Sequence, residues 1–204
     1  MDNMLILAID SAGAGCGVGV WRDGVVVARA QEAMERGQDA RLVPMIIGVM
    51  KDAGAEFPQL DKIAVTRGPG SFTGLRVGLA TARGIGLAAG KQVIGIDRFA
   101  IYRALRPNGD LLAVIDSRRA EMFCRFFEGS TAHEPSLMTQ EQIGAFKTAH
   151  PNAQIAGDKA TPADDILAAC ALLASTADAM HPDYLPRPLY LREPDVTFAS
   201  AKSR

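Results

Sequence analysis

The sequence predicts an α/β fold of two lobes, and three observations support the prediction. A chain of 204 residues can bury one sizeable hydrophobic core or two small ones. Strand patterns and helix patterns alternate after an opening series of hairpins. The scheme of residues 5–21, an apolar strand, Ile-Asp-Ser, a turn and a second strand, returns at residues 111–127. We therefore expect a duplicated domain, with residues 1–106 as the N-terminal lobe and residues 107–204 as an abbreviated C-terminal lobe.

The first lobe is expected to open with three antiparallel strands, at residues 5–10, 17–21 and 25–30. Asp23-Gly24 joins the last two, and such a pair is typical of hairpin turns because Gly accepts a positive φ. Apolar spacing then predicts a helix over residues 39–51, with Pro44 in its first turns. The remaining elements are expected to be a strand at 62–66, a helix at 73–89, a strand at 92–97 and a short helix to about residue 105. This order predicts a mixed sheet covered by helices.

The second lobe repeats the strand, turn, strand scheme and then continues less regularly. We expect a helix at residues 139–149, a strand at 153–156 and a helix at 163–178. The tail at residues 181–195 is rich in proline, which cannot continue a helix and restricts the residue before it. The tail is therefore expected to run extended over the surface.

The long helix of the first lobe has two rows of small residues. Gly74, Gly78, Ala82 and Gly86 recur every four positions, as do Ala80, Gly84 and Ala88. At 3.6 residues per turn the two rows lie about 200° apart, on opposite faces. Glycine within a helix costs about 1 kcal/mol relative to alanine, so the glycines need a packing reason. We expect one face to cover the sheet and the other to cover a partner.

This argument predicts an intersubunit helix bundle, with an internal helix sandwiched within its own lobe as the alternative. The segment is too apolar for a helix with one face in water, and its glycines and two arginines argue against a membrane span. The predicted interface residues come from both helices of the first lobe: Leu42, Met45, Ile46, Val49, Gly74, Val77, Gly78, Ala80, Thr81 and Gly84.

Charge and cysteine usage limit the functional classes. Lys and Arg number 22 against 23 for Asp and Glu, so no bulk positive field draws the chain to nucleic acid or an anionic membrane. Cys16, Cys124 and Cys170 are odd in number and outside any C-x-x-C, which favours a reducing compartment. The first apolar run is too short for a signal sequence. We expect a cytoplasmic protein without membrane contact.

Four segments together resemble one known family: ILAIDS at residues 6–11, GPGSFTGLRVG at 68–78, VIDSRRAEMF at 114–123 and PLYLR at 188–192. Paired hairpins with strand-terminal aspartates resemble the actin, sugar kinase and Hsp70 superfamily, with its RNase H-like lobes, whose hairpins grip nucleotide phosphates through a metal. Within that superfamily, GPGSFTGLR is the specific segment, and the chain resembles the bacterial TsaB (YeaZ) family over nearly its whole length.

The resemblance implies a non-catalytic scaffold that binds and activates TsaD. The TsaD complex transfers a threonylcarbamoyl group to N6 of adenosine 37 in tRNAs that read codons beginning with A. Further implications are a TsaE-type ATPase as partner, tRNA contact through the complex, a homodimer when isolated, and ATP used by the complex with no cofactor required by this chain. Two alternatives stay open: an autonomous nucleotide-dependent kinase or hydrolase, and a peptidase-like hydrolase.

Metal ligands and a nucleophile are missing from the sequence pattern. TsaD holds its metal with a His-x-x-x-His pair on one helical face, and the comparable positions here are Gln38 and Leu42. The three histidines, His133, His150 and His181, show no ligand spacing and are interpreted as surface or capping residues. Ser71 has no sequence-marked base. We therefore expect no metal site and no catalytic residue.

A nucleotide site between the lobes is the weaker hypothesis. Its candidate residues lie at the strand ends and in the glycine loop: Asp10, Ser11, Gly68, Gly70, Ser71 and Asp116. The loop matches neither a Walker motif nor G-x-G-x-x-G, and Ser71 or Thr73 would more simply cap the following helix. The second turn carries Arg118-Arg119 in place of small residues, which argues against a metal-nucleotide there, and only Gly157 hints at an adenine-binding turn. We expect both aspartates to close turns.

Overall fold

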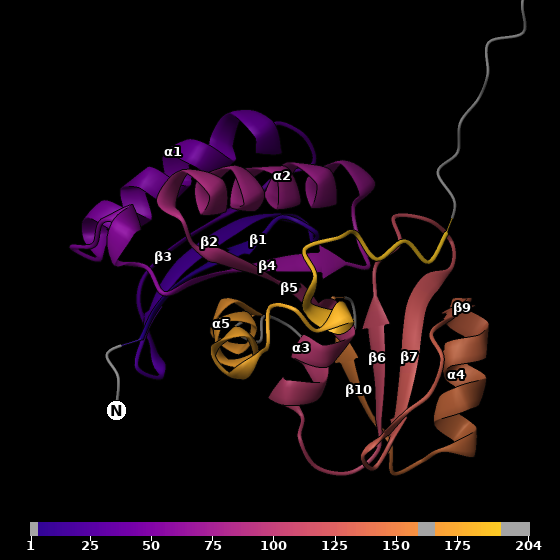
Figure 1. Ribbon diagram of the computed structural model, residues 1–204. Coiled ribbons are helices and arrows are strands. Elements are labelled where there is room, and N and C mark those ends of the chain that lie inside the picture. Colours follow the sequence, from indigo (N-terminus) through magenta and orange to yellow (C-terminus); the bar gives the residue numbers. More distant parts are fainter. Residues whose placement is uncertain (1–3, 159–165, 193–204) are drawn as a thin grey trace, which may run out of the picture.

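The computed structural model describes residues 4–158 and 166–192, which form two lobes built on two mixed sheets (Figure 1). The first sheet has the order β3-β2-β1-β4-β5. Its strands are β1 (Leu5–Asp10), β2 (Gly15–Arg22), β3 (Val25–Ala33), β4 (Lys62–Gly68) and β5 (Gln92–Asp97). β1 pairs antiparallel with β2 and parallel with β4, so the predicted mixed sheet is confirmed.

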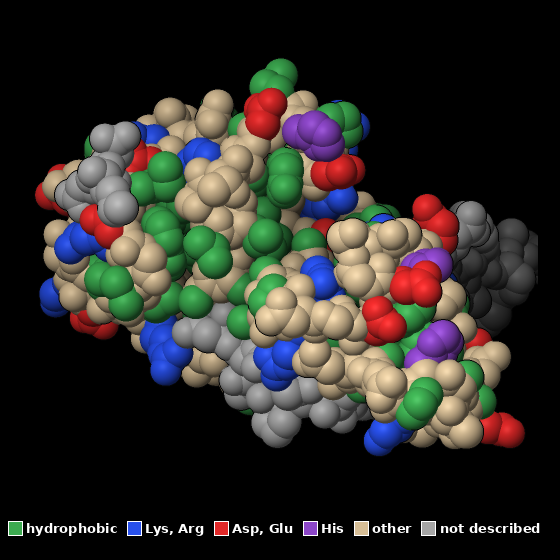
Figure 2. Space-filling model, turned by 90° about the horizontal axis from the view of Figure 1, so that it is seen from below, with side chains coloured by type: hydrophobic (Ala, Val, Ile, Leu, Met, Phe, Trp, Pro, Cys, Tyr) green, Lys and Arg blue, Asp and Glu red, His purple; other side chains and the backbone are tan. Residues whose placement is uncertain are grey.

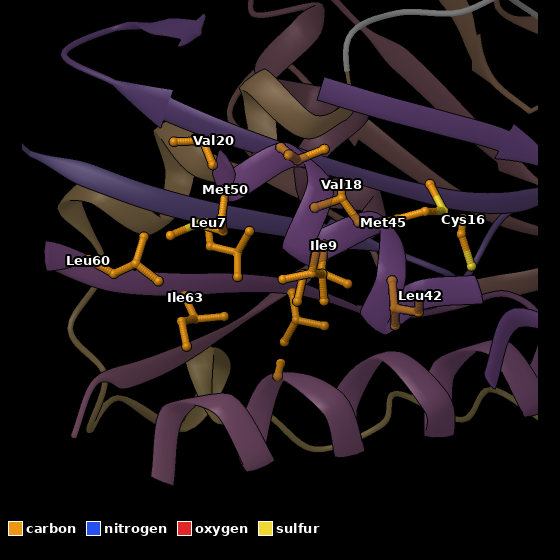
Figure 3. Close-up of a cluster of buried hydrophobic side chains, with 14 of the residues drawn as sticks. Leu7, Ile9, Cys16, Val18, Val20, Leu42, Met45, Met50, Leu60 and Ile63 are labelled. Atoms are coloured by element: carbon orange, nitrogen blue, oxygen red, sulfur yellow. The ribbon is translucent and has the colours of Figure 1, made fainter. Parts of the chain in front are cut away.

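Two helices lie side by side on one face of the first sheet: α1 (Gln38–Asp52) and α2 (Phe72–Ala89) (Figure 1). Between them and the sheet lies a core of aliphatic side chains, of which Leu7, Ile9 and Leu42 are fully buried (Figure 3). α1 begins one residue earlier than predicted, and Pro44 lies inside the helix, as its seventh residue. Its side chain is exposed there, which keeps the ring out of the core.

The opposite face of the same sheet is covered by α5 (Ile166–Thr176), which belongs to the second half of the chain (Figure 1). Residues 163–165 of the predicted helix lie outside the described part. The Lys62 Nζ donates to the backbone carbonyls of Ala174, Ser175 and Ala177, each at 3.0 Å. A cation is favourable there because the carbonyls at a helix C-terminus lack intrahelical partners. The first sheet is therefore buried on both faces.

The second sheet repeats the topology of the first. β6 (Leu111–Ile115) pairs antiparallel with β7 (Met122–Glu128) and parallel with β10 (Gln154–Gly157), as β1 does with β2 and β4. Two short strands, β8 (Thr131–Ala132) and β9 (Ser136–Met138), complete it along β7. The predicted duplicated α/β fold is confirmed. Strand order alone gives no sign that α5 returns to the first sheet.

Two helices cover the second sheet. α3 (Arg98–Leu105) packs Phe99 and Tyr102 against β6 and β7. α4 (Gln140–Ala149) packs Ile143 against the other face and begins at a capping box between Thr139 and Gln142.

The C-terminal segment joins the two lobes. After η2 (Pro182–Tyr184) the chain runs extended to residue 192, as predicted, along the edge of the first sheet and towards the second (Figure 1). The Leu189 N–H donates to the Arg67 carbonyl at 2.7 Å. A second short 3-10 helix, η1 (Phe57–Gln59), precedes β4. No helix within the described ranges is long and apolar enough to cross a membrane.

Candidate functional site

The inner face of α2 lies so close to the β1 end that only small residues fit. Gly74 and Gly78 are buried, and a Cβ on them would lie 1.9 Å from the Ser11 carbonyl oxygen and 2.2 Å from the Ser11 Oγ, respectively. The Ser11 hydroxyl donates to the Gly74 carbonyl at 2.7 Å. The row that contains Gly74, Gly78, Ala82 and Gly86 thus faces the chain's own sheet. Ser71 caps the helix, as expected, by accepting from the Gly74 N–H at 3.2 Å.

The outer face of α2 is exposed and carries small and apolar residues, together with Arg76 and Arg83. Ala80, Gly84 and Ala88 lie on it, together with Leu87, whose exposed fraction is 88%. On the adjacent α1, Val43 and Ile47 are 46% and 56% exposed. Between the two helices runs a groove of about 340 Å³ with an almost wholly apolar lining: Val43, Ile46, Ile47, Phe57, Pro58, Ile85, Ala88 and Ala89. This surface, named the α1/α2 face here, is the main unpartnered apolar region of the first lobe.

The structure corrects the predicted interface set at six positions. The six residues with almost no surface for a second chain are Leu42, Met45, Ile46, Val49, Gly74 and Gly78. Their burial follows from the helical period, which turns the most apolar face of α1 towards the sheet. Val77 and Thr81 are partly exposed, and Ala80 and Gly84 are exposed. Exposed residues beside them that the sequence argument missed are Val43, Ile47, Leu87 and Ala88.

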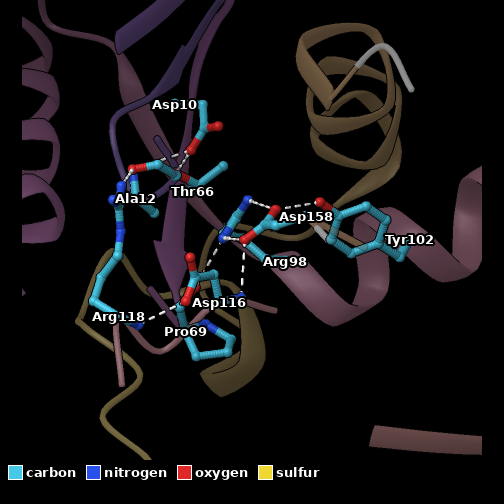
Figure 4. Close-up of polar contacts among 10 residues, drawn as sticks. Asp10, Ala12, Thr66, Pro69, Arg98, Tyr102, Asp116, Arg118 and Asp158 are labelled. Carbon is cyan, nitrogen blue, oxygen red and sulfur yellow. Dashed lines mark hydrogen bonds and ion pairs between the residues drawn. The ribbon is translucent and has the colours of Figure 1, made fainter. Parts of the chain in front are cut away.

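Asp10 acts as a structural side chain at the seam between the lobes. Its Oδ1 accepts from the Thr66 hydroxyl at 2.7 Å and from the Ala12 N–H at 3.1 Å, which closes the turn after β1 (Figure 4). The counterpart Asp116 accepts from the Arg118 N–H at 2.8 Å, across a turn in which Arg118 has a φ of 62°. Both aspartates therefore close the turns at their strand ends.

A buried arginine is the centre of the seam. Arg98 is 1% exposed and donates to both oxygens of Asp158, from Nη1 at 3.1 Å and from Nη2 at 2.7 Å (Figure 4). Its Nη1 also donates to the Pro69 carbonyl at 3.3 Å. Asp158 accepts further from the Tyr102 hydroxyl at 2.6 Å and from the Asp116 N–H at 3.1 Å. This network joins the glycine loop of the first lobe to two strand ends of the second.

Electrostatics reinforce the pair. Burial disfavours the charged form of Arg98, but Asp158 and then Asp10 outweigh it, so the pKa of Arg98 is raised. Burial likewise opposes ionisation of Asp158, but the Arg98 guanidinium outweighs it and holds the pKa of Asp158 below its ordinary value. Burial, with the Asp158 charge adding to it, raises the pKa of Tyr102. The pair therefore stays ionised at neutral pH, and Tyr102 remains a hydrogen-bond donor.

Sequence reasoning missed Arg98 and Asp158. The available signals were an arginine directly after the strand-end Asp97, at the start of a helix, and an aspartate directly after the strand-end Gly157. Gly157 itself has a φ of 144°, and a Cβ there would lie 1.7 Å from the Val114 carbonyl oxygen. Glycine at this position therefore lets β10 lie close to β6.

The glycine loop is shaped by chain packing. Gly70 has a φ of 156°, and its Cβ would lie 2.3 Å from the Ala12 carbonyl oxygen. Gly68 has a φ of 106° and lies against the tail, where its Cβ would be 3.0 Å from the Leu189 carbonyl oxygen. Of the predicted nucleotide residues, Asp10, Ser11, Gly68, Gly70 and Ser71 therefore all hold the first lobe together.

Gln38, the histidines and the cysteines, which the sequence offers as possible ligands or reactive thiols, all contact other parts of the fold. Gln38 is buried, and its Nε2 lies 3.5 Å from the carbonyls of both Met34 and Glu35. His181 accepts from the Asp183 N–H as a cap, while His133 and His150 are exposed beside Phe126. Within residues 4–158 and 166–192, no three His, Cys, Asp or Glu side chains are grouped to hold a metal ion. All three cysteines are buried, and burial raises the pKa of the Cys124 thiol to about 12.

Comparison with known proteins bears on the family and the fold. The family model for TsaD, tRNA N6-adenosine threonylcarbamoyltransferase, matches residues 30–134. The tRNA threonylcarbamoyladenosine biosynthesis protein TsaB of Escherichia coli is 38% identical over 124 residues, 59% of this chain and 53% of the relative. TsaB of Haemophilus influenzae is 34% identical over 127 residues, 60% and 53% of the two chains. The chain thus spans about half the length of the curated relatives it matches.

A solved structure gives the fold. YeaZ from Pseudomonas aeruginosa superposes with a TM-score of 0.70 at 22% identity, covering 92% of this chain and 100% of the other. This likeness confirms the two-lobed α/β fold. Because the TsaD family model matches more than half of the chain, the chain belongs to the family that this model describes, and it is similar in sequence to the TsaB proteins of two bacteria.

Proposed function

We propose that this chain is an accessory subunit of tRNA threonylcarbamoyladenosine synthesis and pairs through the α1/α2 face with a TsaD homologue. The observation that supports the proposal most is the exposed apolar face itself, with Leu87 at 88% and Ile47 at 56% exposure beside an apolar groove. Burying such a face against a partner removes apolar surface from water, which stabilises a complex. Alanine and glycine on the same face permit helices to approach closely.

The identity that we propose for the partner rests on the family model that matches this chain. The matching model describes a transferase, so this chain and that transferase are homologues with lobes of one plan. Homologous surfaces suit pseudo-symmetric pairing, in which the same helices of both subunits form one bundle. In isolation, the chain would cover the face with a second copy of itself. Pairing would activate the transferase if the paired conformation binds this chain better than the alternative one does.

We propose no chemical step for this chain. Asp10 is engaged by Thr66 and Ala12, and Asp158 is paired with the Arg98 guanidinium, so both carboxylates already have protein partners where an actin-like protein would place a metal-bound nucleotide. The residues therefore do not fit such a group. Transfer and ATP use are therefore assigned to the TsaD homologue and a TsaE-type ATPase.

Reconstitution tests the proposal. Purified TsaD homologue, TsaE-type ATPase, tRNA, ATP and the threonylcarbamoyl donor are combined with and without this chain, and threonylcarbamoyladenosine is measured by mass spectrometry of digested tRNA. We expect product to depend on this chain and to be lost with Ala80→Arg but not with Ala145→Arg, an exposed alanine on α4. Equal product without the chain would refute the proposal, and product from the chain alone would establish the enzyme alternative.

A further inference from the structure

A second cavity, of about 470 Å³, lies where three distant segments meet: the glycine loop with the start of α2, the turn after β6, and the C-terminal segment. Its lining is Pro69, Gly70, Ser71, Phe72, Thr73, Leu75, Ser117, Arg118, Arg119, Phe123, Leu189, Tyr190, Leu191 and Arg192. Neither partner of the buried Arg98–Asp158 pair lines it, although Pro69, whose carbonyl accepts from Arg98, lies in its wall. It is also outside the α1/α2 face.

The charge of this cavity differs from that of the molecule. Three of its lining residues are arginines, Arg118, Arg119 and Arg192, and among residues 4–158 and 166–192 no aspartate or glutamate lines it. The whole chain has a formal net charge of −1, and on the face shown in Figure 2 basic and acidic side chains lie interspersed. Positive charge is therefore concentrated at the cavity. Such a pocket attracts anions locally without a basic surface overall.

Two of the arginines are held in place by the protein. The Arg118 Nη2 donates to the Gly13 carbonyl at 3.0 Å, across the seam, and its backbone has the positive φ noted above. The Arg192 Nη2 donates to the Glu121 Oε2 at 2.6 Å. Each guanidinium has five N–H donors, so one such contact leaves donors for a ligand and fixes the side chain beforehand. Glu121 offsets the charge of Arg192, whereas the contact of Arg118 is to a neutral carbonyl, so Arg118 keeps its full charge for attraction.

The opposite wall adds polar groups and a rigid aromatic edge. Phe72 and Thr73 are the first residues of α2, where backbone N–H groups lack carbonyl partners within the helix and carry partial positive charge. Phe72 and Tyr190 pack with ring centroids 4.9 Å apart, and Arg76 lies over the Phe72 ring and donates to the Tyr190 hydroxyl at 3.1 Å. These contacts order the wall that faces the arginines.

We propose that this cavity binds a phosphate group, carried either by a nucleotide or by the RNA backbone. Guanidinium forks match the paired oxygens of phosphate, which favours phosphate over a spherical anion. The two sources share this chemistry, and the cavity is large enough for more than the phosphate alone. The inference does not depend on pairing through the α1/α2 face, since the two surfaces have no lining residue in common.

Fluorescence anisotropy of the full chain tests the inference, with fluorescein-labelled ADP and a fluorescein-labelled single-stranded RNA as the two probes, in 50 mM salt without divalent metal. We expect at least one probe to bind and the Arg118→Gln/Arg119→Gln variant to weaken that binding at least tenfold. If the bound probe is RNA, the slope of log K against log salt should also become shallower by about 1.4, because two phosphate contacts are lost on a single strand.

Two further variants keep the test decisive. Arg36→Gln/Lys51→Gln removes the same charge at exposed positions outside the cavity and should leave binding within twofold. Arg119→Gln alone leaves the Arg118 bridge to Gly13 intact and should still weaken binding about threefold. Absence of binding by both probes, or equal loss in the cavity and control variants, would overturn the proposal. If only the cavity variants weaken binding, the probe that binds, RNA or ADP, identifies which molecule carries the phosphate group.

Discussion

The two small-residue rows of α2 have nearly the same composition and opposite roles. On the inner face, a methyl group at Gly74 or Gly78 would overlap Ser11, so glycine is required for folding. On the outer face, a Cβ at Gly84 would meet nothing within 4 Å, and the residue is exposed. Gly48 on α1 is in the same situation. Small residues in a helix therefore have two different explanations, close packing within the chain or packing against a partner. Only the structure distinguishes between them.

The outer glycines are unexplained by the fold of the chain alone. Glycine in a helix interior is less favourable than alanine by about 1 kcal/mol, and neither Gly48 nor Gly84 has a positive φ or a close neighbour that demands it. A partner helix that packs close to the α1/α2 face would provide a reason. The following predictions test this contrast, starting with the largest effect.

Gly78→Arg should prevent folding of the first lobe. The new side chain would have to enter the space filled by Ser11 at the end of β1, where neither its volume nor its charge can be accommodated. We expect a loss of more than about 4 kcal/mol, measured as a missing cooperative transition in circular dichroism. Ala80→Arg, two residues away on the exposed face, should fold normally. A folded Gly78→Arg variant would contradict the assignment of the inner face.

Asp158→Asn should destabilise the chain by about 3 kcal/mol, because it leaves the guanidinium of Arg98 buried without its counter-charge. Chemical denaturation at pH 7 measures the loss, and Asp183→Asn, an exposed carboxylate, is the control. An effect below about 1 kcal/mol would show that the seam does not depend on this pair.

The same pair gives a pH dependence with a defined sign. The pKa of Asp158 is lower in the folded state than its ordinary value of 3.8, so its stabilisation is complete above pH 4 to 5 and declines as pH falls through the folded pKa. The stability difference between the wild type and Asp158→Asn should therefore shrink below about pH 4. A difference that stays constant down to pH 2.5 would contradict the ion-pair account.

Lys62→Met should cost about 1 to 2 kcal/mol, since the Nζ donates to three carbonyls at the end of α5 and methionine keeps the aliphatic stem. Hydrogen exchange should show faster opening of α5 than of α2. Lys51→Met, at an exposed position on α1, serves as the matched control and should change stability by less than about 0.5 kcal/mol.

Gly84→Ala has the smallest expected effect on folding. It should stabilise the isolated monomer by up to about 1 kcal/mol, because the helix gains a better helix former and no clash arises. Its association, measured by analytical ultracentrifugation, should nonetheless weaken. Unchanged association would leave the outer glycine without a role in pairing.

Much of the fold was predictable because its signals are local. Asp23-Gly24 indicated the hairpin of β2 and β3, apolar spacing located α1, and repeated Ile-Asp-Ser segments revealed the duplication confirmed by the parallel β1/β4 and β6/β10 pairs. The position of α5 was not predictable, since an apolar helix gives no sign of which sheet it will cover.

The candidate site was predictable only in part. The two small-residue rows of α2 pointed correctly to two different faces, but the sequence did not distinguish the core face of α1 from its outer face, and so Leu42 and Val49 were placed in the interface. Arg98 and Asp158 lie 60 residues apart and meet only through the folding of both lobes. Long-range pairing of this kind leaves no periodic signal in a single sequence.

The most direct test of the central claim is the mass of the complexes formed by Ala80→Arg and Ala145→Arg, measured by size-exclusion chromatography with light scattering, alone and with the TsaD homologue. Both variants add one arginine to an exposed helical position and should keep the wild-type circular dichroism spectrum. The account predicts that Ala80→Arg is a folded monomer that does not bind the TsaD homologue, while Ala145→Arg associates like the wild type. Wild-type association by a folded Ala80→Arg variant would contradict it.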